Sequence, residues 1–114
     1  MLLTPIARRQ FAENGVFCPG SHGDYPEAVR QVGREEQVPV IDLTAATENF
    51  LADLGDEPSK PLFVWPKDNT HLKYDGAVKM VEFLCAELAR MGRPYADLLY
   101  CSESEEPEIN DEIF

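Results

Sequence analysis

Long apolar runs are absent from this sequence, and basic residues are scarce. No apolar run in its 114 residues approaches the roughly 20 residues that a membrane-spanning helix needs. Lysine and arginine together number 10 against 21 acidic residues, which gives a formal net charge of −11. Because binding to phosphate groups needs clustered basic side chains, we expect neither nucleic acid nor an anionic membrane surface as a partner. No secretion signal is visible, so the compartment stays open.

Cysteine is rare as well. Cys18, Cys85 and Cys101 form no CxxC pair. An odd number of cysteines without such a pair indicates neither a disulfide framework nor a zinc site. We therefore expect no metal centre and no cofactor. Cys85 falls among apolar residues at helical spacing, which is typical of a small core residue.

The acidic charge is concentrated at the end of the sequence. Residues 102–114 contain no basic side chain and six acidic ones, namely Glu103, Glu105, Glu106, Glu108, Asp111 and Glu112. The remaining residues carry a net charge of −5. We interpret residues 96–114 as an acidic, flexible tail and residues 1–95 as one domain, since that length is enough for a single core.

Two strands and a connecting loop are predicted in the first half of the chain. The short apolar run Leu2–Ile6 predicts a buried strand, and residues 13–24, rich in Gly, Pro and Asn, predict a long surface loop. The β-branched run Val38–Leu43 predicts a second buried strand. A short helix is then predicted over Thr44–Leu54, before a glycine that can stop it.

A helix is predicted between the two strands, over Tyr25–Gln37. Ala28, Val29 and Val32 give this helix one apolar face. Gly33 is expected to weaken the helix locally, by on the order of 1 kcal/mol relative to alanine.

The last helix has the clearest pattern in the sequence. It is predicted over Gly76–Met91, with Asp75 as its N-cap and Gly92 as its stop. Its apolar residues recur at helical spacing and predict a stripe that faces a core. The stripe consists of Ala77, Val81, Leu84, Cys85 and Leu88.

Alternating strands and helices are typical of an α/β fold with a parallel sheet. Only two strands are convincing in this sequence, whereas a parallel sheet usually has more and is covered on both faces. The sequence therefore looks like the second half of a larger α/β domain whose N-terminal strands are missing.

One polar loop between two apolar elements places Asp68 and His71 close together, in "KDNTH". They could be ordinary loop residues, metal ligands, or the acid–base end of a catalytic site. A metal site would need further ligands, for which His22 and Asp24 are the candidates. In a hydrolase, a histidine can act as the base for a serine hydroxyl, while a carboxylate on its other ring nitrogen fixes the tautomer.

Three segments extend this pattern: "LLTPIARRQF", "GDYPEAVRQVGREEQVPVIDLT" and "DNTHLKYDGAVKMVEFLCAEL", in that order. Together they resemble the C-terminal half of the rhamnogalacturonan acetylesterase-like members of the SGNH/GDSL hydrolases, over roughly Leu2 to Gly92. The resemblance implies a flavodoxin-like, three-layer α/β/α fold and the hydrolysis of carbohydrate esters, typically acetyl groups. It also implies that His71 takes the place of the general base and Asp68 that of its orienting partner.

The other motifs of that family are absent from these 114 residues. The family's nucleophile lies in a Gly-Asp-Ser block, and its oxyanion donors are that serine's backbone, a glycine and a later asparagine. Here the Gly-Asp of "GSHGDY" is followed by Tyr25. Ser21, Ser59, Ser102 and Ser104 have no strand-to-helix context that would present a nucleophile. We therefore expect the isolated chain to be nearly inactive on acetyl esters.

Two hypotheses follow from this pattern. In the first, the dyad works only when a missing N-terminal half completes an esterase for an acetylated carbohydrate or another small ester. That half could be another polypeptide or could have been lost from the gene. In the second, the chain is a non-catalytic remnant or interaction domain. It would then associate through an exposed sheet edge, with a partner or as a homo-oligomer.

Overall fold

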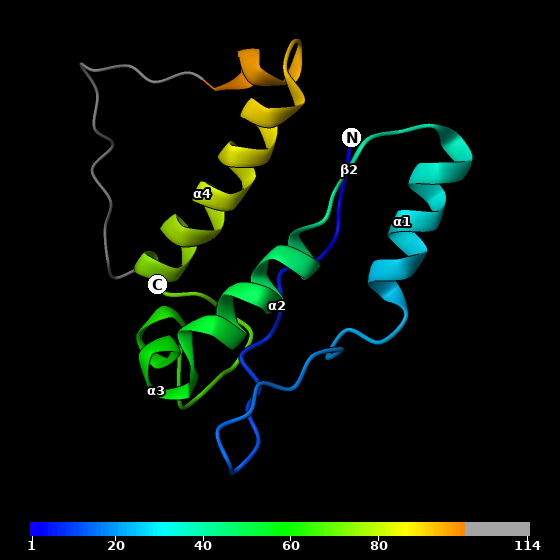
Figure 1. Ribbon diagram of the computed structural model, residues 1–114. Helices are drawn as coiled ribbons and strands as arrows, with labels where there is room; N and C mark the ends of the chain where they lie inside the picture. Colours follow the sequence, from blue (N-terminus) through cyan, green and yellow to red (C-terminus); the bar gives the residue numbers. More distant parts are fainter. Residues whose placement is uncertain (100–114) are drawn as a thin grey trace, which may run out of the picture.

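The computed structural model describes residues 1–99. The predicted acidic tail from Ser102 onward and Cys101 therefore lie outside the described residues. Along the chain the elements are β1 (Leu2–Leu3), α1 (Tyr25–Glu36), β2 (Val40–Ile41), α2 (Leu43–Leu54), α3 (Asp56–Ser59), the 3₁₀ turn η1 (Lys60–Leu62), α4 (Tyr74–Met91) and the 3₁₀ turn η2 (Tyr95–Leu98) (Figure 1). Within residues 1–99, no helix combines the length and apolar character needed to cross a membrane.

The two strands pair in parallel, with Leu2 opposite Val40 and Leu3 opposite Ile41. Figure 1 shows this short sheet between α1 on one side and α4 on the other. The described chain therefore has an α/β fold with a parallel sheet, as predicted, and in residues 1–99 this sheet has two strands.

Both strands are shorter than predicted, and for β1 the cause lies in α2. After β1, residues of the chain form hydrogen bonds with two threonines in the first half of α2. The Thr4 hydroxyl accepts a bond from the backbone N–H of Thr44 at 2.9 Å, and the Ala7 N–H donates to the Thr47 hydroxyl at 2.9 Å. Both bonds are buried. The Thr4 N–H still donates to the Ile41 carbonyl at 3.0 Å, but the Ala7 N–H bonds to a side chain of α2 in place of a strand partner. The segment that leads toward the candidate site is thus fixed on α2.

A glycine joins α1 to the sheet. A Cβ atom at Gly33 would lie 2.2 Å from the Val40 Cγ2 atom, so only glycine permits this close approach of helix and strand. The prediction that Gly33 is merely a weak point in the helix was therefore incomplete. The predicted apolar face of α1 is also not its buried face, because Val32 is 45% exposed and Ala28 is exposed.

Helix α4 follows the predicted stripe except at Val81. It begins at Tyr74, so Asp75 lies in its first turn and does not cap it. Leu88 is buried with Ile41 of β2 and Leu43 of α2, and Leu84 packs against this cluster, whereas Val81 is 55% exposed. Met80, outside the stripe, is buried as well. The predicted stripe was thus partly wrong. When the apolar strip of a helix is wider than the face that contacts the core, some of its residues stay exposed. The neighbouring elements decide which residues these are.

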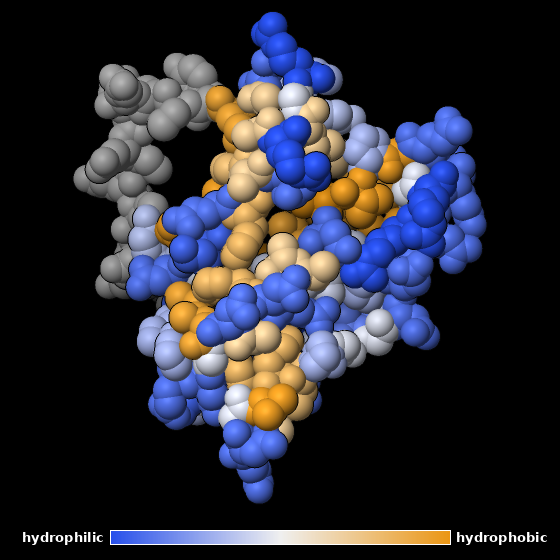
Figure 2. All heavy atoms as spheres, in the orientation of Figure 1, coloured by the Kyte–Doolittle hydropathy of each residue, from blue (hydrophilic) through white to orange (hydrophobic). Residues whose placement is uncertain are grey.

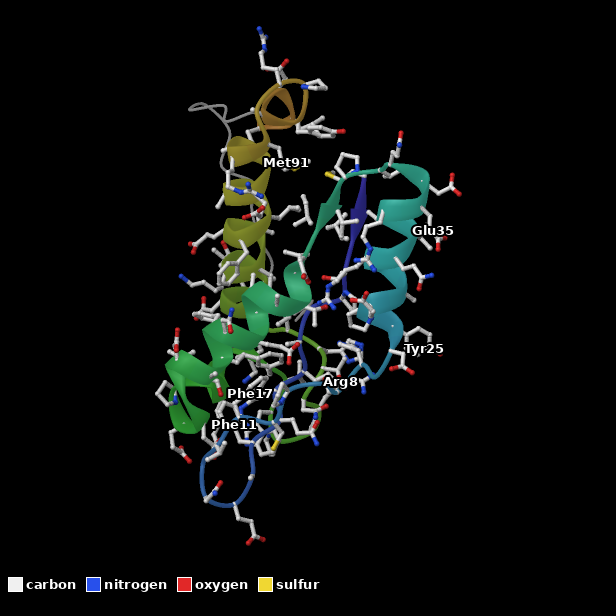
Figure 3. The ribbon with its side chains drawn as sticks, turned by 45° about the vertical axis from the view of Figure 1, so that its right-hand side comes forward. Arg8, Phe11, Phe17, Tyr25, Glu35 and Met91 are labelled. Atoms are coloured by element: carbon white, nitrogen blue, oxygen red, sulfur yellow. The ribbon has the colours of Figure 1, made fainter. Side chains whose placement is uncertain are left out.

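A small apolar cluster lies below the sheet, where the chain leads to the candidate site. Ala7, Leu51 and Phe63 are its buried members. Phe11 and Phe17 pack against it from the first long loop, with ring centroids 5.4 Å apart in an edge-to-face arrangement (Figure 3). Phe63 is fully buried, so the chain just before the dyad loop is anchored in the core.

A carboxylate fixes the carboxyl end of the sheet. Asp42 caps α2 through the Ala45 N–H and accepts the Thr4 hydroxyl at 2.9 Å. Arg30 of α1 donates two further bonds to it, at 2.9 and 3.0 Å. The Arg30 bonds, as the largest cause, lower the pKa of the Asp42 carboxyl below 3.8. One side chain thus joins both strands to two helices.

Replacing Gly33 with alanine tests the contact between α1 and β2. Overpacking costs about 1–3 kcal/mol, while alanine restores about 1 kcal/mol of helix propensity. We expect Gly33→Ala to lower the free energy of unfolding, measured by urea denaturation. The penalty should shrink in a Val40→Ala background, because the clashing methyl is then gone. If Gly33→Ala stabilised the protein, the described contact would be wrong.

Replacing Asp42 with asparagine tests the carboxylate junction through pH. Because folding lowers its pKa, Asp42 contributes stability at pH values above 3.8 and loses it as the pH falls through the folded pKa. The free energy of unfolding should therefore drop more steeply for the wild type than for Asp42→Asn between about pH 5 and about pH 2. Arg30→Met is the matched variant and should flatten the same part of the profile. Parallel profiles for all three proteins would contradict the assignment.

Candidate functional site

The dyad loop, which we define as residues 64–71, is closed at its base by backbone pairing. Phe63 and Leu72 form an antiparallel bridge. Next to it the Val64 N–H donates to the His71 carbonyl at 2.9 Å, and the Lys73 N–H donates to the Leu62 carbonyl at 2.9 Å. The loop therefore projects from a fixed base.

A glycine allows α4 to begin directly against this base. A Cβ atom at Gly76 would lie 2.1 Å from the Leu62 carbonyl oxygen. A clash with backbone cannot be relieved by rotating a side chain, so any other residue would push the helix start away from the loop. The glycine that the sequence places just inside the helix thus fixes the distance between the dyad loop and α4.

Asp68 and His71 contact each other directly, as the resemblance predicts. Asp68 Oδ2 lies 2.7 Å from Nδ1 of His71. The other oxygen, Oδ1, accepts the backbone N–H of His71 at 2.7 Å and that of Thr70 at 2.5 Å. The His71 side chain is 77% exposed and that of Asp68 is 34% exposed. The carboxylate is thus held by its own loop, while the imidazole faces solvent.

These bonds favour the charged form of the acid. The backbone N–H of His71, then its side chain, and then the N–H of Thr70 lower the pKa of the Asp68 carboxyl from 3.8 to about 2. At neutral pH the carboxylate is therefore ionised, and it lies within hydrogen-bond distance of Nδ1 of His71.

The residues considered as metal ligands are not gathered around the dyad. His22 directs Nε2 to the Ile6 carbonyl oxygen, 2.7 Å away. In the part of the chain that the structure describes, no three His, Cys, Asp or Glu side chains are grouped so that they could hold a metal ion. Asp68 and His71 instead satisfy each other.

The serines among the described residues are not presented to the dyad as a nucleophile. Ser59 is fully buried and donates its hydroxyl to the Asp56 carbonyl at 2.7 Å. Ser21 lies half-buried in the long loop before α1. Ser102 and Ser104 lie outside the described residues. The described serines therefore give the dyad no evident nucleophile.

Arg9 supports the dyad loop, a role that the sequence did not predict. Its backbone N–H donates to the Asn69 carbonyl at 2.9 Å, between Asp68 and His71 in sequence. Its side chain is only 3% exposed and forms an ion pair with Asp56. In the sequence Arg9 follows the predicted strand Leu2–Ile6 beside a second arginine, and its contact with Trp65 is made only in the fold.

In the dyad a carboxylate oxygen lies 2.7 Å from Nδ1 of a histidine. Comparison with curated proteins finds two that are similar to the chain. The chain is 34% identical, over an alignment of 118 positions, to rhamnogalacturonan acetylesterase RhgT of Bacillus subtilis (strain 168), covering 93% of this chain and 50% of that protein. It is 32% identical, over 100 positions, to the probable rhamnogalacturonan acetylesterase YesY of the same organism, covering 85% of this chain and 45% of that protein.

The chain is therefore a relative of the rhamnogalacturonan acetylesterases, and the resemblance predicted from its motifs is confirmed. It spans about half the length of the curated relatives that it matches, as expected for a correspondence to their C-terminal half. No protein-family model matches the chain. No solved structure matches it either.

The pKa of Asp68 tests the described bonds of the dyad loop. Carboxyl carbon shifts followed by NMR should titrate at about pH 2 for this residue. In His71→Ala the backbone donors remain, so the pKa should rise but stay below 3.8. In concentrated urea it should return to 3.8 in both proteins. A folded-state value near 3.8 in the wild type would show that the loop does not hold the carboxylate as described.

Proposed function

We propose that this chain supplies the acid–base half of an SGNH-type carbohydrate acetylesterase. In this proposal His71 is the general base and Asp68 is its orienting partner. The observation that carries the proposal is the double role of the Asp68 carboxylate. One oxygen binds Nδ1 of His71, and the other binds two backbone N–H groups of the same loop. The imidazole is thereby oriented without help from distant residues.

The chemistry follows from that orientation. As a serine oxygen bonds to the acetyl carbonyl carbon, its proton moves to Nε2 of His71, and Asp68 stabilises the imidazolium through Nδ1. The proton then passes to the sugar oxygen as the ester C–O bond breaks. A water molecule next gives a proton to Nε2 as its oxygen bonds to the acyl carbon. The bond from that carbon to the serine oxygen then breaks, the serine oxygen takes the proton back from Nε2, and acetic acid leaves and ionises to acetate.

The serine and the oxyanion donors would come from sequence corresponding to the half of the relatives that this chain does not match. That sequence would also complete a flavodoxin-like, three-layer α/β/α domain. Support comes from apolar side chains that residues 1–99 leave exposed on three elements, and Figure 2 shows an apolar band between hydrophilic flanks on one face. These exposed side chains include Leu3 on β1, Tyr25 and Val32 on α1, and Val78 and Val81 on α4.

The proposed substrate is acetylated rhamnogalacturonan, the polymer in the names of both relatives. Its galacturonate carboxylates are anionic, and this chain carries a net charge of −11. Lys67 and Lys73 are exposed and lie on either side of the dyad in sequence. In this proposal their charge offsets the repulsion close to the reacting ester.

A second candidate function is association without catalysis. The observation that favours it is the combination of the same exposed apolar side chains with a sheet of two strands, since an uncovered strand edge is a template for pairing. Size-exclusion chromatography with light scattering separates the two. A stable complex with no acetyl release after completion would favour this function.

Completing the domain tests the esterase proposal. The 114-residue chain alone should release almost no acetate from acetylated rhamnogalacturonan. A fusion to the segment of RhgT that this chain does not match should release acetate, and His71→Ala in the fusion should abolish that activity. Asp68→Asn should reduce kcat by about 10⁴-fold, because the imidazole takes the wrong tautomer.

The matched control uses the other histidine in the sequence. His22→Gln keeps a group that can bond to the Ile6 carbonyl, so the fused protein should remain active. Acetate release that His71→Ala does not change would reject the proposed base. Release by the chain alone that depends on His71 would reject the need for a second half.

A further inference from the structure

A fixed tryptophan stands in the dyad loop, beside the proposed base. Trp65 is the one tryptophan of the sequence and is 38% exposed. The guanidinium carbon of Arg9 lies 4.4 Å from its ring centroid, on a side chain that is 97% buried. Arg9 is held in turn by its ion pair with Asp56 and by a 2.9 Å bond to the Asp56 carbonyl. The indole is therefore a supported flat surface and not a loose side chain.

The tryptophan borders a cavity of about 340 Å³. That volume is at the lower end of the range of small-ligand sites, about 300–1,000 Å³. Polar side chains surround the indole in this cavity, and they include an amide from each of two segments. The polar residues are Arg9, Gln10, Glu13, Asp56, Lys60 and Asn69.

One loop connects this cavity to the dyad. Asn69 lines the cavity and follows Asp68 directly in sequence. The bond from the Arg9 N–H to the Asn69 carbonyl fixes the cavity wall to the same loop that carries His71. A ring bound on Trp65 would therefore hold the adjoining part of a polymer close to the imidazole.

The cavity has the chemistry of a site for an uncharged sugar. A sugar ring has an apolar C–H face, which packs on an indole, and a rim of hydroxyls, which bond to amides and carboxylates. Formal charges within the lining balance, since Arg9 and Lys60 stand against Glu13 and Asp56. Arg9 is already paired with Asp56, and Lys60 lies 2.5 Å from Glu57. Each basic side chain of the lining thus already has a carboxylate partner, and the lining carries no net charge that would select a uronate.

We propose that this cavity is a subsite for the neutral sugar, rhamnose, of rhamnogalacturonan, stacked on Trp65. This inference rests on the proposed function for the identity of the polymer. Binding a neutral ring here would present the neighbouring acetylated galacturonate to His71. Trp65, Gln10 and Asn69 would then determine specificity, without taking part in proton transfer.

Because Trp65 is the one tryptophan, its fluorescence reports this cavity directly. We expect deacetylated rhamnogalacturonan oligosaccharides to produce a saturable change in the emission of the 114-residue protein. Oligogalacturonates of the same length should bind at least about tenfold more weakly, since they lack the neutral ring. Equal binding of both, or no saturable change with either, would overturn the proposal.

Matched variants locate the binding within the chain. Gln10→Ala and Asn69→Ala should each weaken rhamnogalacturonan binding by up to about tenfold, the value of one lost hydrogen bond. Gln31→Ala, an exposed amide on α1, is the control and should bind like the wild type. Wild-type affinity in both cavity variants would place the sugar elsewhere and reject the subsite.

The subsite and the esterase proposal can fail separately. His71→Ala should bind the oligosaccharide normally, because the imidazole is not part of the cavity lining. Normal binding together with an inactive fusion would reject the esterase and keep the subsite. An active fusion in which Gln10→Ala leaves KM unchanged would reject the subsite and keep the esterase.

Discussion

The burial of Phe63 is the constraint on which the candidate site depends. Its ring is fully buried with Ala7 and Leu51, and its backbone pairs with Leu72. Removing a buried phenylalanine ring typically costs about 3–5 kcal/mol, a large share of the stability of a domain of this size. This ring anchors one end of the dyad loop, and α4 anchors the other. The position of His71 therefore follows from apolar packing several residues away.

The dyad itself is a local structure. Asp68 receives all three of its bonds from residues within its own loop, so the pair forms wherever the loop is closed. In the proposed function, by contrast, the nucleophile and the oxyanion donors come from other elements. This difference explains how a chain that spans half the length of its relatives can hold an ordered acid–base pair. The geometry of the pair does not require the rest of the domain.

Local chemistry also determines what the sequence could predict. The spacing of Asp68 and His71 left three interpretations open, and the family resemblance was needed to pair them, whereas the three long helices were predicted to within a few residues at their ends. What failed depends on tertiary contacts. The Ala7 N–H bonds to Thr47 of α2, Val40 requires glycine at position 33, and Val81 of α4 is exposed although its spacing predicts burial. Such contacts cannot be derived from spacing along one chain.

Arg9 makes one contact through its side chain and one through its backbone. A substitution changes the first and leaves the second. Its side chain supports Trp65, while its backbone N–H holds the carbonyl of Asn69. Exchange of the side chain alters the support of the indole but leaves the backbone bond in place, since every residue except proline keeps that N–H. A substitution at this one position can therefore change the packing on Trp65 while the backbone bond to the dyad loop persists.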